Sequence, residues 1–564
     1  MSRSRFGTIA LLLVAACGLL TTSAALSAQR GAPPATVSPS TRIDVADLRR
    51  WLTDVASDDL QGREVFQEGL GLAATYLADQ LRALGVEPAG EDGSYFQPVR
   101  VLGIRNTGVS SVTVTVKGQS RTFRDGEGVR FPKGQGGRQT VSGDAVFIGY
   151  GVEFAPLKHD DYAGRDVSGK VAVHIGRGPQ GITATQNRLL FARSRTATFD
   201  HRAVAAIGAE TEPPGTPAAP PRNPDRQADF QSAADYERPQ PPQVTADDEF
   251  LRFVFSASGS DYDDLKAKAE RRESLPRVSL ADVHLRFDIR PDYTVVQTRL
   301  TRNVLGRVRG AEPALRDSWV ILGAHYDHVG YAEFAVQPNE GAFTGICPGQ
   351  TRPTPAPGDR IFNGADDDGT GTVALLAIAK AYARGPKPKR SVLFVWHAGE
   401  EAGLYGSRYM ADHPVVPLDR VSAQLNVDMI GRNQCDNPAE ANVLYLVGSD
   451  RISSELHATG ELANAASARP MTLDYSYNDP ADMEQLYYRS DHFSYAARGV
   501  PVTFFTTGLH RDYHYVTDDV SRIDFAKMTR VTSLIYDTSW RIANLDHLLT
   551  RDNRGPRAIR RVGR

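Results

Sequence analysis

The chain has 564 residues, of which 41% are hydrophobic and 23% are charged. This composition is that of a soluble globular protein, with room for two to four domains of about 150 residues each. Its 65 Lys and Arg residues nearly balance its 67 Asp and Glu residues, so the formal charge is −2. Because no basic excess exists to attract a phosphate backbone, the composition argues against nucleic acid as a partner.

The first residues have the three-part layout of an export signal. Two arginines precede an uncharged apolar run over 6–20, and small residues follow it. The run is shorter than the roughly 20 apolar residues of a membrane-spanning helix. We therefore expect a signal peptide over 1–28, no membrane span, and a secreted or periplasmic protein. The alternative is a lipid anchor at Cys17, because the sequence VAAC that ends there resembles a bacterial lipobox.

A linker rich in Pro and Ser over 29–42 leads into a segment over 43–139 that begins with helical patterns. The sequence predicts two helices between 43 and 84, the second of which ends at Gly85 in the manner of a C-cap. The stretch SDDLQGR at 57–63 is predicted to be the loop between them.

From about residue 140, short runs of Val, Ile and Phe predict a β-rich module over 140–284. Inside it, nine prolines lie between Pro213 and Pro242, in a stretch with few apolar residues. Such a stretch cannot bury a core of its own, so we expect the excursion over about 211–243 to lack regular structure.

From residue 285 to 550, strands and helices alternate, and a basic tail follows over 551–564. The predicted strands lie at 318–324, 391–396, 422–428, 442–448 and 500–506, and the predicted helices at 370–384 and 523–543. This alternation predicts an α/β fold with an open, mostly parallel mixed sheet flanked by helices, into which the β-rich module is inserted. In such sheets, ligands bind beyond the carboxyl ends of the strands.

The stretch GAHYDHVG places a histidine at the end of the first of these strands. Asp327 stands two residues after His325 and can accept the other imidazole N–H, which would fix the tautomer that binds metal. A surface histidine beside an aspartate would give the same pattern, so this stretch alone decides nothing.

The stretch NGADDDGTG puts three aspartates on a glycine-rich turn before a helix. Three adjacent carboxylates repel one another unless a cation is bound. We take Asp367 as a bridge between two metals, and Asp366 and Asp368 as supporting or capping residues. A helix cap without metal would need only one aspartate.

The stretch HAGEEAGLYGS has paired glutamates directly after an apolar strand. One carboxylate can bind metal while its neighbour accepts a proton from metal-bound water. We assign Glu400 as the general base and Glu401 as the metal ligand. A solvated acidic turn is the alternative, but the apolar strand leading into the pair argues against it.

Two further single ligands complete the set. Asp428 follows the apolar strand in LNVDMIG, and His514 follows the strand VPVTFFTT. His510 is the competing histidine, and we expect it to be a pocket residue. Two histidines and three carboxylates, one of them bridging, suit two divalent ions, most naturally zinc, about 3.5 to 4 Å apart.

Three cysteines are present, and one of them lies in the signal segment. The other two, Cys347 and Cys435, both follow ligand stretches, and we predict a disulfide between them in an oxidising compartment. Two free buried thiols are the alternative. No C-x-x-C pair occurs, which argues against a cysteine-based zinc site.

Together these stretches resemble the co-catalytic di-zinc exopeptidases, a family that includes secreted bacterial aminopeptidases and glutamate carboxypeptidase. The resemblance covers most of the chain after the signal and is carried by HYDH, GADDDGTG, GEEAGLYGS, NVDMIG, SDHFSYAARGVPVTFF and YHYVTDD. The stretches SDDLQGRE and FIGYGVEF, with DDYAGRDVSGKVAV, are similar to the N-terminal part and the inserted protease-associated domain of larger members. The long Pro-rich excursion departs from the family pattern.

The resemblance implies an exported aminopeptidase with two zinc ions that hydrolyses peptide bonds near the N-terminus of a peptide or protein. One zinc would be held by His325, Asp367 and Asp428, and the other by Asp367, Glu401 and His514. Catalysis is assigned to Glu400, supported by Asp327. Substrate contacts are assigned to Tyr488, Asp491, His492 and His510.

Three alternatives remain. A carboxypeptidase or dipeptidase would need Arg or Lys for a substrate carboxylate, whereas an aminopeptidase would need carboxylates for a free amine. The sequence offers both kinds of residue: Asp491, Asp512, Arg489, Arg498 and Arg511. The third alternative is a binding ectodomain of the same fold without metal ligands, as in the transferrin receptor, but here all five ligands and the base are present. The oligomeric state is left open.

Overall fold

The computed structural model describes residues 43–132, 137–154, 157–182, 193–209, 229–232, 239–337, 342–343, 347, 349–479, 482 and 484–553. The predicted signal peptide with Cys17, the linker over 29–42 and nearly all of the basic tail lie outside these residues. Within the described part of the chain, no helix combines the length and the apolar character needed to cross a bilayer.

Among the described residues, the main sheet has ten strands, and its centre is parallel. The central strands, in spatial order, are β18 (Ser391–His397), β15 (Trp319–His325), β19 (Val421–Val427) and β22 (Val502–Thr506), and each pair of neighbours is parallel. Beyond β18 lie the antiparallel strands β14 (Tyr293–Val308), β2 (Phe96–Asn106) and β11 (Asp229–Ser232), and the short β1 (Glu87–Pro88) also pairs with β14. Beyond β22 lie β20 (Val443–Val447), which is antiparallel to it, and β21 (Thr472–Asp474). The predicted α/β fold with a mixed sheet is confirmed, and its parallel part is the centre.

The central strands are buried on both faces, which explains their unbroken apolar sequences. In β15, Val320 and Leu322 belong to one hydrophobic core, while Ile321 between them belongs to the core on the opposite face. The same alternation runs through β18, where Phe394 and Val395 face opposite cores. Side chains at the strand ends are therefore held by two packed layers.

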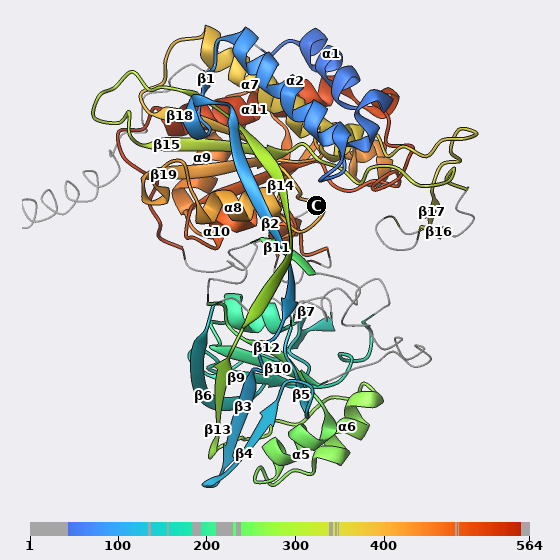
Figure 1. The fold of residues 1–564 in the computed structure, drawn as a ribbon, viewed down its shortest axis with the longest axis vertical. Coiled ribbons are helices and arrows are strands. Elements are labelled where there is room, and N and C mark those ends of the chain that lie inside the picture. Colours follow the sequence, from blue (N-terminus) through green and yellow to red (C-terminus); the bar gives the residue numbers. More distant parts are fainter. Residues whose placement is uncertain are drawn as a thin grey trace, which may run out of the picture. The chain divides into compact units, whose positions relative to one another are not determined.

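Helices cover both faces of this sheet (Figure 1). One core receives side chains from α1 (Val45–Val55), α2 (Glu68–Leu84), α7 (Gly371–Arg384), α9 (Ser454–Ala465) and α11 (Phe525–Ala543). The opposite core receives side chains from α8 (Tyr405–Asp412) and α10 (His492–Ala496). Helix α2 ends at Gly85, whose φ of 77° is the left-handed conformation predicted for that position.

A second sheet of eight strands contains most of the β-rich module. Its spatial order is β4 (Gln119–Arg124), β3 (Ser111–Val116), β13 (Val283–Ile289), β6 (Gln139–Phe147), β9 (Val171–His174), β10 (Ala205–Ala209), β12 (Gln243–Ala246) and β5 (Val129–Arg130). Helices α5 (Asp248–Phe255) and α6 (Tyr262–Glu270) pack on it. Two short pairs complete the strands: β7 (Glu153–Phe154) with β8 (His159–Asp160), and β16 (Ala342–Phe343) with β17 (Gln350–Thr351).

The second sheet begins earlier than the expected boundary at residue 140. The chain leaves the main sheet along β2 and returns along β14, and these two strands pair antiparallel. Between them, β3 starts at Ser111 and pairs with β13 over its whole length. The reason is the alternating stretch SVTVTV at 111–116, whose valines are buried on one face of this sheet.

Part of the Pro-rich excursion has regular structure, contrary to expectation. Residues Asp229–Ser232 form β11, which pairs antiparallel with residues 101–104 of β2. An edge strand gains its backbone hydrogen bonds from the neighbouring strand, so it needs no apolar core of its own. The rest of the excursion up to residue 238 lies outside the described residues.

Candidate metal centre

The carboxyl ends of the central strands bring the predicted ligands to one edge of the main sheet. His325 is the last residue of β15, Asp428 directly follows β19, and Glu400 and Glu401 lie on the turn after β18. His514 lies in the loop after β22, and Asp367 lies in the helical turn Ala365–Thr370 that precedes α7. Parallel strands end at the same edge, so residues far apart in sequence meet there.

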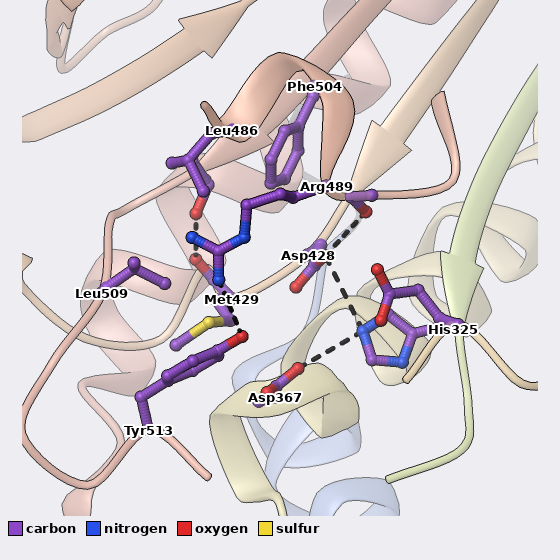
Figure 2. Close-up of a pocket in the computed structure, with 12 residues that line it drawn as sticks. His325, Asp367, Asp428, Met429, Leu486, Arg489, Phe504, Leu509 and Tyr513 are labelled. Atoms are coloured by element: carbon purple, nitrogen blue, oxygen red, sulfur yellow. Dashed lines mark hydrogen bonds and ion pairs between the residues drawn. The ribbon is translucent and has the colours of Figure 1, made fainter. Parts of the chain in front are cut away.

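The first group consists of His325, Asp367 and Asp428, whose ligand atoms lie within 4.8 Å of one another. His325 Nε2 lies 3.3 Å from Asp367 Oδ1 and 3.7 Å from Asp428 Oδ2. All three side chains are buried. Figure 2 shows both carboxylates directed at the same imidazole nitrogen.

The second group shares Asp367 with the first and adds Glu401, His514 and His328. His514 Nε2 lies 3.1 Å from Asp367 Oδ2 and 2.9 Å from Glu401 Oε2. His328 Nδ1 lies 2.9 Å from Glu401 Oε1. Asp367 thus turns Oδ1 to one group and Oδ2 to the other, as a bridging carboxylate does.

The donor atoms of the second group fit a cation. Asp367 Oδ2 and His514 Nε2 are buried and make no hydrogen bond to any of the described residues, although they lie 3.1 Å apart. Burial alone would lower the pKa of His514, but the carboxylates of Asp367 and Glu401 raise it to about 10. The surroundings therefore favour positive charge at this position, and imidazole nitrogen with carboxylate oxygen is a typical donor set for zinc.

Glu400 belongs to neither group of ligand atoms, but its side chain lines the same cavity as His325, Asp367 and Asp428. Burial raises its pKa well above the usual value; the neighbouring His325 opposes this shift, and Glu401 adds to it. This carboxyl therefore holds its proton more firmly than a solvent-exposed glutamate does.

Asp327 supports the paired glutamates rather than the histidine. Its carboxylate accepts the backbone N–H of Glu400 at 3.1 Å and that of Glu401 at 3.3 Å. His325 Nδ1 lies 3.1 Å from the backbone carbonyl oxygen of Asp327 and 3.8 Å from its carboxylate. The imidazole is thus oriented by the backbone carbonyl of Asp327. The carboxylate of Asp327 instead accepts hydrogen bonds from the turn after β18.

The two aspartates that flank Asp367 attach its turn to the loop after β19. Asp368 Oδ1 accepts the N–H of Gly371 at 2.9 Å and that of Met429 at 3.2 Å. Asp366 Oδ1 accepts the N–H of Gly431 at 2.7 Å. Both flanking aspartates therefore accept hydrogen bonds from backbone N–H groups, and of the three carboxylates only that of Asp367 points into both ligand groups.

A pocket opens beside the first ligand group (Figure 2). Besides ligands and Glu400, it is lined by Met429, Leu486, Arg489, Ser490, Phe504, Thr506, Leu509 and Tyr513. None of the four residues assigned to substrate contacts, Tyr488, Asp491, His492 and His510, lines this pocket. The short helical turn Leu486–Tyr488 and helix α10 send successive side chains in different directions, which the sequence does not reveal.

Each of the four assigned substrate residues has another partner. Tyr488 donates its hydroxyl proton to Asp200, and Asp491 Oδ2 lies 3.3 Å from His397 Nδ1. His492 stacks on Phe504 with the ring centroids 4.9 Å apart, and His510 Nε2 lies 3.3 Å from Asp366 Oδ2. These residues surround the site without facing the pocket.

Of the charged residues considered for substrate termini, only Arg489 lines the pocket. Its guanidinium donates to Glu484 Oε2 at 2.8 Å and to the Tyr513 hydroxyl at 3.1 Å. Each of the others already has a side-chain partner: Asp491 lies beside His397, Asp512 pairs with Arg432, Arg498 with Asp412, and Arg511 with Asp436.

A disulfide joins Cys347 to Cys435 beside this site. The N–H of Cys435 donates to the carbonyl of Leu509, a pocket residue, at 2.8 Å. Five residues after Cys347, Arg352 donates to the carbonyls of Tyr513 and His514, each at 3.3 Å. The disulfide therefore fixes a loop that supports the backbone of His514.

Two residues near the metal ligands were missed by the sequence analysis. His328 is the second histidine of HYDH, three positions after His325, and that doubling was the available signal. Tyr513 directly precedes His514, and its ring stacks on the imidazole with the centroids 3.9 Å apart. Both residues lie close in sequence to a predicted ligand, so the sequence placed their backbone near the site. It did not show that their side chains point towards it.

Residues 303–539 match the model of Peptidase family M28. A probable leucine aminopeptidase of Arthroderma otae is 27% identical over 246 residues, which are 42% of this chain and 57% of that protein. A probable leucine aminopeptidase 2 of Aspergillus oryzae is 28% identical over 217 residues, or 38% of this chain and 34% of that protein. The chain thus spans about half of the first relative's length and about a third of the second's.

Two solved structures are also similar to this chain. An aminopeptidase from Aneurinibacillus sp. strain AM-1 is 17% identical, with 92% of this chain and 97% of that chain covered and a TM-score of 0.42. A zinc aminopeptidase from Bacillus subtilis is 16% identical, with 89% of this chain and 96% of that chain covered and a TM-score of 0.42.

Proposed function

We propose that the protein is an exopeptidase with two zinc ions and that it acts as an aminopeptidase, a proposal supported by the match of residues 303–539 to the model of Peptidase family M28. The observation that carries the proposal is the shared Asp367, whose two carboxylate oxygens face two separate groups of ligand atoms. His325 and Asp428 would hold one ion with Asp367. Glu401 and His514 would hold the other, with His328 within reach as a further ligand.

When bound, the two ions would supply a water molecule whose pKa is lowered towards neutrality and a positive charge that polarises the peptide carbonyl. Glu400 would accept the proton of the attacking water and then deliver it to the leaving amine. Its position beside the first ligand group and the shared Asp367, and outside both groups of ligand atoms, supports this role.

Tyr513 is the candidate donor to the oxygen that gains charge during hydrolysis, in place of Tyr488. Its hydroxyl oxygen accepts an N–H from Arg489 at 3.1 Å, which leaves its own proton free for a substrate oxygen. The hydroxyl belongs to the pocket wall beside the ligands (Figure 2). Tyr488, in contrast, donates to Asp200 and lies outside that wall.

The charges of the pocket argue against recognition of a substrate carboxylate. Zinc would occupy Asp367 and Asp428, Glu400 would serve as the base, and the guanidinium of Arg489 is already paired with Glu484 at 2.8 Å. A substrate carboxylate would have to compete with Glu484 for Arg489, which favours a peptide that enters with its amino end. Apolar side chains from Met429, Leu486, Phe504 and Leu509 would contact the residue next to the amine.

The proposal is tested with three versions of one peptide, assayed on zinc-loaded protein: free at both ends, acetylated at the N-terminus, and amidated at the C-terminus. An aminopeptidase cleaves the amidated peptide as fast as the free one and fails on the acetylated one. A carboxypeptidase gives the reverse result. A dipeptidase requires both free ends and does not cleave longer peptides. A binding ectodomain would hydrolyse none of them, whether or not it binds zinc.

The disulfide and the apolar run over 6–20 support export to an oxidising compartment. The second sheet, between Ser111 and Ile289, would be the inserted protease-associated domain. A lipid anchor at Cys17 is distinguished from a cleaved signal peptide by the mass of the mature N-terminal residue.

A further inference from the structure

A buried arginine from the loop SDDLQGR lies beside the metal centre. The side chain of Arg63 is fully buried, and its guanidinium donates to four backbone carbonyl oxygens. The distances are 2.9 Å to Tyr326, 2.7 Å to Val55, 2.7 Å to Asn363 and 2.9 Å to Gly364.

Three of these carbonyls belong to the two segments that carry His325 and Asp367, and the fourth, that of Val55, ends helix α1. Tyr326 stands directly after the ligand His325, and Gly364 stands three residues before the bridging Asp367. The backbone of the loop adds two further hydrogen bonds to the first segment. His328 N–H donates to the Arg63 carbonyl at 3.1 Å, and Gly330 N–H donates to the Gly62 carbonyl at 3.0 Å. One loop thus joins the segment of His325 to the segment of Asp367.

The residue type is suited to this position. A guanidinium is planar and has five N–H donors in a fixed arrangement, whereas a lysine ammonium has three donors at one point and cannot span the same carbonyls. Burial lowers the pKa of Arg63, and the carboxylates of Asp327 and Asp367 oppose that shift. The charge is therefore retained in the interior and neutralised by the acids of the metal centre.

The backbone of Arg63 is also in an unusual conformation. Its φ is 50°, in the left-handed region, which is unfavourable for a residue with a Cβ atom. The neighbouring Gly62 has a φ of 68°, and a Cβ atom there would lie 2.1 Å from the carbonyl oxygen of Gly330. Such conformations persist where the surrounding contacts fix them.

We propose that Arg63 is a positioning residue of the metal centre, which holds the segments of His325 and Asp367 at the separation that zinc binding requires. The family match begins at residue 303, so this centre would depend on a loop that lies 240 residues before the first matched residue. The inference rests on the proposed zinc site.

The test measures zinc affinity by competition with a chromophoric chelator, on the full-length protein and two lysine variants, Arg63→Lys and Arg390→Lys. Arg390 is the matched control because it is also fully buried and donates to two backbone carbonyls, those of Ile542 and His547, but it precedes β18 at the opposite end of that strand. We expect Arg63→Lys to weaken zinc binding by about 10-fold to 100-fold, as loss of a supporting partner does elsewhere. Arg390→Lys should lower the thermal midpoint and leave zinc affinity unchanged.

Equal zinc affinity in the wild-type protein and Arg63→Lys would overturn the inference, and so would an equal loss in both lysine variants. A wild-type protein that binds no zinc would instead overturn the proposed function. If circular dichroism shows that Arg63→Lys does not fold, Gly62→Ala takes its place, because it displaces the loop while keeping the arginine. Its matched control is Gly85→Ala, at a left-handed glycine with open space around the added atom. Weaker zinc binding in Gly62→Ala alone supports the inference, and any other result contradicts it.

Discussion

Asp367 is the residue on which both halves of the metal centre depend. Its Oδ1 lies 3.3 Å from His325 Nε2 and its Oδ2 lies 3.1 Å from His514 Nε2. We therefore expect Asp367→Asn to weaken both zinc ions together, whereas Asp428→Asn should weaken only one, because Asp428 belongs to the first group alone. Zinc content after dialysis against a weak chelator measures the difference. Retention of one tightly bound ion by Asp367→Asn would show that this carboxylate does not bridge.

Glu400 can be separated from its neighbour Glu401 by isosteric substitution. Glu400→Gln should retain two zinc ions and lose about 10²-fold to 10⁴-fold in kcat, because the amide cannot accept a proton. Glu401→Gln is the matched control, and it should lose affinity for one ion, since Glu401 Oε2 lies 2.9 Å from the ligand His514. Metal content and kcat are measured on the same preparations. Undiminished turnover by Glu400→Gln would assign the base to another group.

His328 faces the second group only. Its Nδ1 lies 2.9 Å from Glu401 Oε1, so either it binds the second ion or it orients Glu401. In both cases, His328→Ala should weaken one zinc ion by about 10-fold to 100-fold and spare the other. Cobalt substitution distinguishes the two roles, because loss of a directly bound imidazole lowers the number of nitrogen ligands and changes the visible spectrum of the second ion more than reorientation of Glu401 does. An unchanged affinity for both ions would remove His328 from the centre.

Among the elements, helix α7 begins at a position that only glycine fits. Gly371 is the first residue of α7, and a Cβ atom there would lie 2.4 Å from Asp368 Oδ1 and 2.4 Å from the Val427 carbonyl oxygen. The close approach lets the aspartate turn reach the end of β19. Helix α9 contains the contrasting Gly460, whose Cβ atom would only meet Leu446 at 3.4 Å.

These two helix glycines give a paired prediction. Gly371→Ala should destabilise the fold by about 1 to 3 kcal/mol through overpacking, and it should also weaken zinc binding, because the turn of Asp367 must move. Gly460→Ala should be neutral or stabilise by about 0.5 to 1 kcal/mol, since alanine restricts the unfolded chain and fits the helix. Thermal unfolding midpoints compare the variants. A lower midpoint for Gly460→Ala than for Gly371→Ala would contradict the packing argument.

At the scale of the whole molecule, one disulfide connects loops that are 88 residues apart in the sequence. Replacing both Cys347 and Cys435 by Ser should destabilise the fold by about 2 to 4 kcal/mol, because the unfolded chain loses a constraint. Zinc affinity should also fall, since Arg352 holds the carbonyl of His514 from the same loop. Thermal unfolding with and without a reducing agent measures the effect. A reducing agent that lowers the midpoint of the double variant as much as that of the wild type would show that the effect is unrelated to this disulfide.

The chain reaches the second sheet and returns through two paired strands. Asn106 of β2 lies opposite Tyr293 of β14, so the ends of the insertion are neighbours in an antiparallel pair. Replacing residues 107–292 by a two-residue Asn-Gly hairpin turn also removes the edge strand β11, but it should leave the other strands of the main sheet folded and able to bind two zinc ions. Circular dichroism and zinc content test this. A shortened chain that does not fold would show that the main sheet requires the insertion.

The sequence by itself determined the elements and the identities of the residues at their ends. The apolar runs at 318–324, 391–396 and 422–428 became β15, β18 and β19 because strands covered on both faces need apolar side chains at every position. Parallel neighbours must end at a common edge, so His325, Glu401, Asp428 and His514 could be assigned to one place before their contacts were known. Asp367 was assigned from its aspartate-rich turn, which the structure places before α7.

Tertiary structure alone decided where side chains on loops and short helical turns point. Neighbours in the sequence, such as Tyr488 and Arg489, face different partners, and Arg63 meets Gly364 across 301 residues. No local periodicity encodes such contacts, because a turn of a few residues has no repeat from which a direction can be read. Packing between distant segments decides the composition of the pocket wall, the position of His328 and the contacts of Arg63. The positions of most ligands, in contrast, follow from where the central strands end.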